Sequence, residues 1–76
     1  MATDTTSELN ETARRLIRAK LTYLGLSQAD LAIRLGWSRM YVSHRLSGSV
    51  LLSLSDLEAI ANGLGVPIGQ LLAVQA

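Results

Sequence analysis

Apolar residues recur along the first third of the chain at intervals of three, four and one residues, which places them on one stripe of a helix. Ser7 or a neighbouring threonine can cap the start of this helix, and Gly25 can end it. The pattern predicts a helix over about residues 7–24, after a flexible tail over residues 1–6. The positions on the stripe are Leu9, Ala13, Leu16, Ile17, Leu21 and Leu24.

Two shorter helices are predicted next, and each begins after a serine. Ser27 is a favourable N-cap with Asp30 three residues later, as in a capping box, and Gly36 can end that helix. Ser38 can cap a second helix, which Gly48 can end. Two short helices joined by a tight turn with a glycine are typical of the helix-turn-helix motif. The predicted ranges are about 28–35 and 39–47.

The last third of the chain predicts two more helices. Ser55 and Glu58 form an S-x-x-E capping box, and Pro67 suits the first turn of a short final helix. Five helices with short links indicate one compact all-α domain over residues 7–76. The predicted ranges of the last two helices are about 55–64 and 67–74.

Composition supports a helical core and excludes several classes of site. Of the 76 residues, 49% are hydrophobic, yet phenylalanine is absent and aromatic residues make up only 4%. An aliphatic core of this kind favours packed helices. The chain has no cysteine and one histidine, so neither disulfides nor a structural zinc site is expected, because tetrahedral zinc requires four good ligands. No metal and no cofactor is predicted.

The chain contains no run of about 18 apolar residues that could span a membrane. Its first residues, MATDTTSELNE, are polar and acidic, unlike a signal peptide. We therefore expect a cytoplasmic protein without a membrane partner.

Charge is distributed unevenly around the formal net value of +1. All seven basic residues lie between positions 14 and 45, where Asp30 is the only acid, and the acidic residues otherwise lie in the flanks. A basic block of this kind is typical of a surface that faces a polyanion, but a solvated helix face rich in arginine has the same composition. Charge alone does not separate these interpretations.

The predicted helix over residues 39–47 carries an unusual outer face. On a helical wheel Val42 and Leu46 point together toward the domain interior. The opposite side carries groups that donate, accept and make apolar contacts but no carboxylate, as a helix in the DNA major groove requires. These groups are Met40, His44 and Ser47, flanked by Tyr41 and Ser43, with Arg39 at the exposed N-terminal tip.

Catalysis is not indicated at this face. No nucleophile–base pair and no paired carboxylates are suggested near His44, so the chain is predicted not to be an enzyme. Trp37 precedes the cap residue Ser38, where it could pack against Val42 as a hydrophobic staple or reach DNA through its indole N–H.

Several features occur together at fixed spacings over residues 27–72. They are Ser27-Gln28 at the start of a helix, Ala32 at a tight helix crossing, Gly36 in the turn, Val42 in the next helix, Ser47-Gly48 after it, and the closing stretch LGVPIGQLL. With this set the chain resembles the Cro and lambda-repressor-like helix-turn-helix family, the xenobiotic-response-element type that is common in phages and bacteria. The form VSHRLSG is similar to actinobacterial or actinophage members.

The resemblance implies a phage-type repressor or Cro-like regulator that binds a double-stranded DNA operator, with the helix over residues 39–47 in the major groove. It places base reading on Arg39, Met40, Ser43 and His44. One position departs from the family pattern: Arg45 stands where an aliphatic residue is usual, and the apolar residue is Leu46. Either the helix is rotated slightly, or Arg45 leans sideways toward a phosphate or toward an acidic neighbour. The residues expected at the DNA backbone are Gln28, Ser38, Tyr41, Arg45, Ser47 and Arg18.

Apolar residues in the second half of the chain exceed what a small core obviously needs. They could fill the core, or they could form the interface of a homodimer that binds two half-sites. An antitoxin-type protein-interaction module that uses the apolar C-terminal segment is the alternative function, and the chain could also be the DNA-binding part of a longer repressor. The candidate interface residues are Leu51, Leu52, Ile68, Leu71, Leu72 and Val74.

Overall fold

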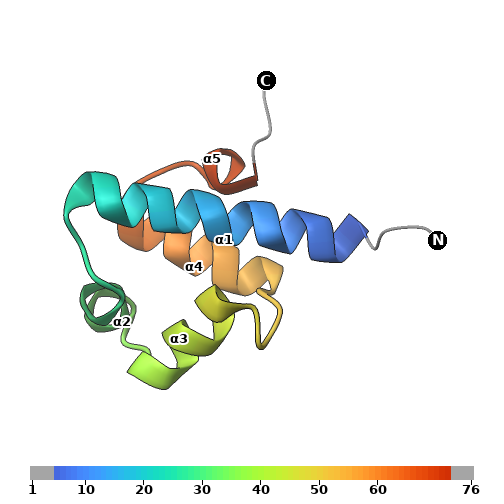
Figure 1. Ribbon diagram of the computed structural model, residues 1–76. Helices are drawn as coiled ribbons and strands as arrows, with labels where there is room; N and C mark the ends of the chain where they lie inside the picture. The colour runs from blue at the N-terminus through green and yellow to red at the C-terminus, as the bar shows by residue number, and fades with distance from the viewer. Residues whose placement is uncertain (1–4, 73–76) are drawn as a thin grey trace.

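The structure, a computed structural model, describes residues 5–72, with side-chain detail from residue 8 onward. Five helices follow one another in this range, as predicted, and the fold is all-α (Figure 1). Val74 and the end predicted for the last helix lie outside the described residues. The helices are α1 (Thr5–Leu24), α2 (Gln28–Leu35), α3 (Arg39–Ser47), α4 (Leu54–Leu64) and α5 (Ile68–Leu72).

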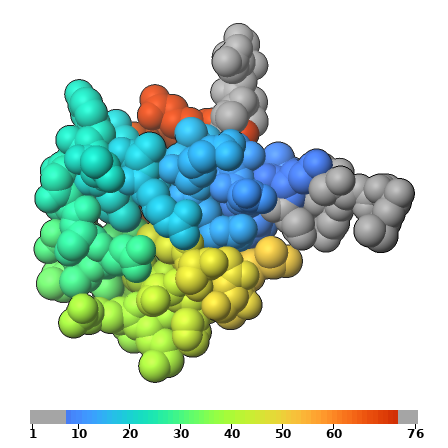
Figure 2. Space-filling view, viewed as in Figure 1, coloured from blue at the N-terminus to red at the C-terminus, as the bar shows by residue number. Residues whose placement is uncertain are grey.

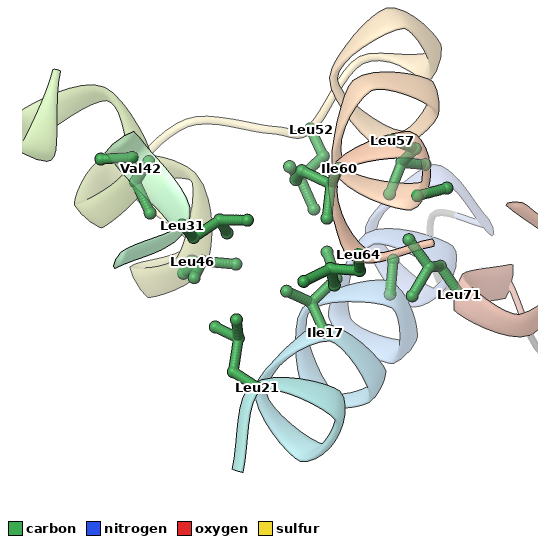
Figure 3. Close-up of a cluster of buried hydrophobic side chains, with 13 residues drawn as sticks. Ile17, Leu21, Leu31, Val42, Leu46, Leu52, Leu57, Ile60, Leu64 and Leu71 are labelled. Carbon is green, nitrogen blue, oxygen red and sulfur yellow. The ribbon is translucent and has the colours of Figure 1, made fainter. Parts of the chain in front are cut away.

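The long helix α1 organises the packing. It lies against α5 on one side and α3 on the other, while α2 contacts both α3 and α4 (Figure 1). Side chains from these helices meet in one aliphatic core, with Ile17, Leu31, Leu46 and Ile60 at most 1% exposed (Figure 3). The inward positions of α3 are Val42 and Leu46, as the helical wheel predicted.

The turn between α2 and α3 is fixed by backbone hydrogen bonds. Gly36 adopts a left-handed conformation with φ of 68°, which a residue with a Cβ rarely tolerates. Its N–H donates to the carbonyl of Ile33, and the next N–H, of Trp37, donates to the carbonyl of Ala32. Ser38 follows at once as the N-cap of α3. The short link therefore fixes how α3 leaves α2.

Three helix starts differ from the prediction. Helix α5 begins at Ile68, one residue late. Helix α1 begins at Thr5, two residues early. Helix α4 begins at Leu54, because the capping box is formed by Ser53 and Asp56: the Ser53 hydroxyl accepts from the Asp56 N–H, and the Asp56 carboxylate accepts from the Ser53 N–H, both at 3.0 Å. The prediction that Ser55 and Glu58 form this box was wrong.

Two of the six predicted interface residues belong to the core. Leu52 is 5% exposed and Leu71 is 2% exposed, so of the two alternatives for these residues the structure shows core burial. Leu52 is also anchored through its backbone, whose N–H donates to the Asn10 side-chain oxygen and whose carbonyl accepts from the Asn10 amide. Leu51 and Ile68 are 49% and 37% exposed, and Leu72 is half-buried.

Candidate nucleic-acid interface

The exposed face of α3 is built by the way the helix starts and packs. Ser38 caps α3 by accepting a hydrogen bond from the Tyr41 N–H at 3.0 Å. Because Val42 and Leu46 fix the inner side of the helix in the core, the opposite side must face outward. Arg39, Ser43 and His44 are exposed on that side. Met40 lies there as well, with 67% of its surface exposed.

These side chains share one open hollow of about 550 Å³ with the start of α2. In the space-filling view α2 and α3 form the lower end of the molecule (Figure 2). All four residues predicted to read bases line the hollow, and so does Gln28, predicted at the DNA backbone. The full lining is Gln28, Ala29, Arg39, Met40, Ser43 and His44. It contains one cation and no carboxylate, so it presents no charge that would repel phosphate.

The flank of α3 faces the protein itself. The Tyr41 hydroxyl donates to the Asp56 carboxylate at 2.6 Å, and the Arg45 Nε lies 3.5 Å from the other carboxylate oxygen. The Tyr41 ring contacts the Trp37 ring, with centroids 4.6 Å apart, and the Arg45 guanidinium, whose carbon is 3.6 Å from the ring centre. The sequence left open whether Arg45 points toward a phosphate or toward an acidic neighbour. In the structure it points toward an acidic neighbour, Asp56.

These contacts shift two pKa values. Burial, the largest single effect, raises the pKa of Asp56, but the hydrogen bonds from Tyr41 and Ser53 and the charge on Arg45 together outweigh it and leave the pKa below its usual range. The hydrogen bond to Asp56 raises the pKa of the Tyr41 phenol. Asp56 is therefore ionised at neutral pH, and Tyr41 remains its hydrogen-bond donor.

The C-terminal end of α3 is held by α1. The Arg18 guanidinium donates to the Leu46 carbonyl, and the Arg14 guanidinium lies over Gly48, within 3.4 Å of where a Cβ would be. Cations at this end of a helix also interact favourably with its dipole. Arg18, predicted at the DNA backbone, thus has a partner within the protein. Ser47, predicted there as well, donates to the His44 carbonyl at 3.2 Å.

Asp56 is the residue of this region that the sequence interpretation missed. It lies eleven or more residues from its partners on α3, and no local periodicity connects them. The usable signal was the pair Ser53 and Asp56, which repeats the spacing of Ser27 and Asp30 at the start of α2. This signal identifies Asp56 as a cap residue of α4 but does not connect it to Tyr41 and Arg45.

A second hollow, of about 330 Å³, is apolar and formed by different elements. It lies between the starts of α1 and α4 and the end of α5. Leu9 and Leu54, which line it, are 48% and 74% exposed. The predicted interface residue Leu72 lines it too. The full lining is Leu9, Asn10, Leu52, Leu54, Leu57 and Leu72.

The part of the chain that the structure describes holds no group of three or more histidine, cysteine, aspartate or glutamate side chains placed to bind a metal ion. None of the described helices combines the length and the apolar character that crossing a membrane would require.

Comparison with known proteins gives two matches. A family model described as a helix-turn-helix domain matches residues 8–74. The crystal structure of the hypothetical transcription factor NHTF from Neisseria superposes with a TM-score of 0.78 at 34% sequence identity, covering 84% of this chain and 74% of that one. A search of curated proteins finds no match.

Proposed function

Because the chain belongs to the helix-turn-helix domain family, we propose that it is a sequence-specific regulator of transcription that binds double-stranded DNA, of the phage-repressor or Cro type. The observation that carries the proposal is the common hollow of Arg39, Met40, Ser43 and His44 beside the start of α2. All four are exposed, which supports access by a duplex. The likeness to a hypothetical transcription factor supports the same class.

The chemistry of the hollow suits base reading. Arg39 can pair bidentately with guanine, Ser43 and His44 can donate to or accept from base edges, and Met40 can contact a thymine methyl group. Gln28 at the start of α2 is in place to bind a phosphate and to fix the register of α3 on the duplex. Ser38 and Ser47 lie at the two ends of α3, where backbone phosphates would pass.

One module of this size has few phosphate contacts, so we propose that two copies bind a pseudo-palindromic operator with half-sites about 34 Å apart. The apolar hollow is the proposed contact between copies, with the exposed Leu51 beside it in the chain. Its exposed part is small compared with the roughly 800 Å² per partner of a stable interface. Dimerisation is therefore expected mainly on DNA.

The test is selection of duplexes from a random-sequence library with the whole chain, followed by footprinting and a salt titration. The expected result is one enriched motif with two related halves, and a binding constant that falls steeply with salt because counterions are released. Enrichment of no motif, with equal affinity for all duplexes, would contradict sequence-specific binding.

A second candidate function rests on the apolar hollow. Leu54, 74% exposed at its rim, is the kind of residue that a protein partner covers, which supports an antitoxin-type interaction module. Co-purification of an equimolar partner that Leu54→Glu releases, together with no salt-sensitive DNA binding by the isolated chain, would favour this function over the first.

A further inference from the structure

Asp56 connects two helices through both oxygens of one carboxylate. One oxygen accepts from the Tyr41 hydroxyl at 2.6 Å, and the other accepts from the Ser53 N–H at 3.0 Å and lies 3.5 Å from the Arg45 Nε. The residue is 5% exposed, and it is the buried acid among residues 8–72. It therefore fixes the start of α4 and the flank of α3 at the same time.

The partners of Asp56 form a column along α3. The Trp37 ring and the Arg45 guanidinium both contact the Tyr41 ring. Arg45 follows His44, which lines the proposed DNA hollow, so the column adjoins the reading face. Any rotation of α3 about its axis would break the Tyr41–Asp56 hydrogen bond or the Arg45 ion pair.

The ion pair also decides what Arg45 does near DNA. An unpaired arginine at the edge of a helix in the major groove is expected to bind a DNA phosphate. Such phosphate contacts strengthen binding to every sequence alike. With its Nε against Asp56 and its side chain 20% exposed, Arg45 is withheld from that role. This favours base contacts over backbone contacts at the interface.

We propose that Asp56 is a specificity-determining positioning residue: without touching DNA, it holds Tyr41 and Arg45 on the flank of α3, fixing the orientation of the reading face and keeping Arg45 off the phosphates. The inference rests on the proposed DNA-binding function. It predicts that loss of the Asp56 charge lowers discrimination between sequences while adding a phosphate contact.

The experiment compares Asp56→Asn with the wild-type chain on two probes, the duplex selected by the wild type and a duplex of shuffled sequence. Asparagine retains an oxygen for the Ser53 N–H, so α4 keeps a cap. We expect the ratio of the two dissociation constants to fall about tenfold, as for other coupled networks. The slope of log K against log salt should steepen by about 0.9, the value for one additional phosphate.

Further variants separate positioning from a merely structural role. Asp56→Asn with Arg45→Met should return the salt slope to the wild-type value, because the released cation is gone. Tyr41→Phe removes one hydroxyl and leaves the Arg45–Asp56 ion pair. It should therefore lower the ratio of the two dissociation constants without steepening the salt slope. Glu58→Gln is the matched control, since it removes one negative charge from an exposed position of α4 and should change neither quantity.

A readout without DNA tests the network itself. In a Tyr23→Phe background Tyr41 is the tyrosine that titrates, and its raised pKa should return toward the ordinary value in Asp56→Asn. If the ratio and the salt slope of Asp56→Asn equal those of the wild type, the inference is overturned and the proposed function stands. If the wild type itself binds no duplex in a salt-dependent manner, both are overturned.

Discussion

A carboxylate placed in the proposed DNA hollow should weaken binding to the selected duplex more than tenfold without harming the fold. Met40→Glu is the most direct change, because Met40 lines the hollow and is 67% exposed. Substitutions at such surface positions usually change the free energy of unfolding by no more than about 0.5 kcal/mol. The matched control is Ile33→Glu on α2, which is 79% exposed, lies outside the hollow and alters the net charge equally.

The magnitude follows from Coulomb's law. In a major groove about 12 Å wide, a carboxylate on α3 would lie about 8 Å from the nearest phosphates. At an effective dielectric constant of about 20, each phosphate costs about 2 kcal/mol, which screening at physiological salt reduces to about 0.8 kcal/mol. Two phosphates then weaken binding more than tenfold.

Fluorescence anisotropy with the selected duplex measures this loss, and urea unfolding measures stability. We expect a loss of more than tenfold for Met40→Glu and a much smaller loss for Ile33→Glu, with both variants folded. Equal losses for the two variants would show that only net charge matters. An unchanged affinity of Met40→Glu would refute the placement of α3 in the groove.

Three further predictions concern single residues. Arg39→Ala should weaken the binding free energy by about 1–3 kcal/mol and relax the base preference at one position of the selected motif. Arg15→Ala, on the exposed side of α1, should change neither the affinity nor the motif when both variants are tested by duplex selection. Leu46→Ala, at a fully buried position, should lower the free energy of unfolding by about 2–5 kcal/mol in urea titrations. Hydrogen bonds from Ser27 lower the pKa of Asp30, so the ionised carboxylate stabilises the fold above the unfolded pKa, and this stability is lost as pH falls through the folded pKa. Asp30→Asn should therefore make the free energy of unfolding fall less steeply at acid pH, and an unchanged pH dependence would contradict the pKa shift.

Local signals predicted the part of the fold that carries the site. The bounds of α2 and α3 agree with the prediction because each helix has its own cap and its own glycine stop within a few residues. Gly36 in particular was identifiable as a helix end, and the structure places it in the left-handed conformation. Signals that are contained in one turn of chain can be interpreted without knowledge of the tertiary structure.

The start of α4 could not be predicted in the same way. Ser53-Asp56 and Ser55-Glu58 both have the spacing of a capping box, and glutamate is the more usual partner. What favours the first pair is tertiary: the Asp56 carboxylate is also bound by Tyr41, while Glu58 is exposed. A choice between two equivalent local signals was thus made by a contact with another helix.

The candidate site shows the same division. The outward placement of Met40, Ser43 and His44 followed from helical periodicity, and the structure shows these residues on one exposed face. Which residues on the flank of α3 are available to a ligand did not follow, because Tyr41 and Arg45 depend on Asp56 for their orientation. Periodicity indicates the direction of a side chain but not its partner.

The basic block illustrates why charge in the sequence overstates the charge available to DNA. Arg18 and Arg34 bind backbone carbonyls of α3 and α4, and Arg45 is paired with Asp56. Of the seven basic residues, Arg39 is the one that lines the hollow. Arg45 instead lies at the flank of α3, and Arg14 and Arg18 hold its C-terminal end. A helix held in this way would lose little conformational freedom on binding. If α3 reads bases as proposed, little of the binding free energy would be needed to order the protein.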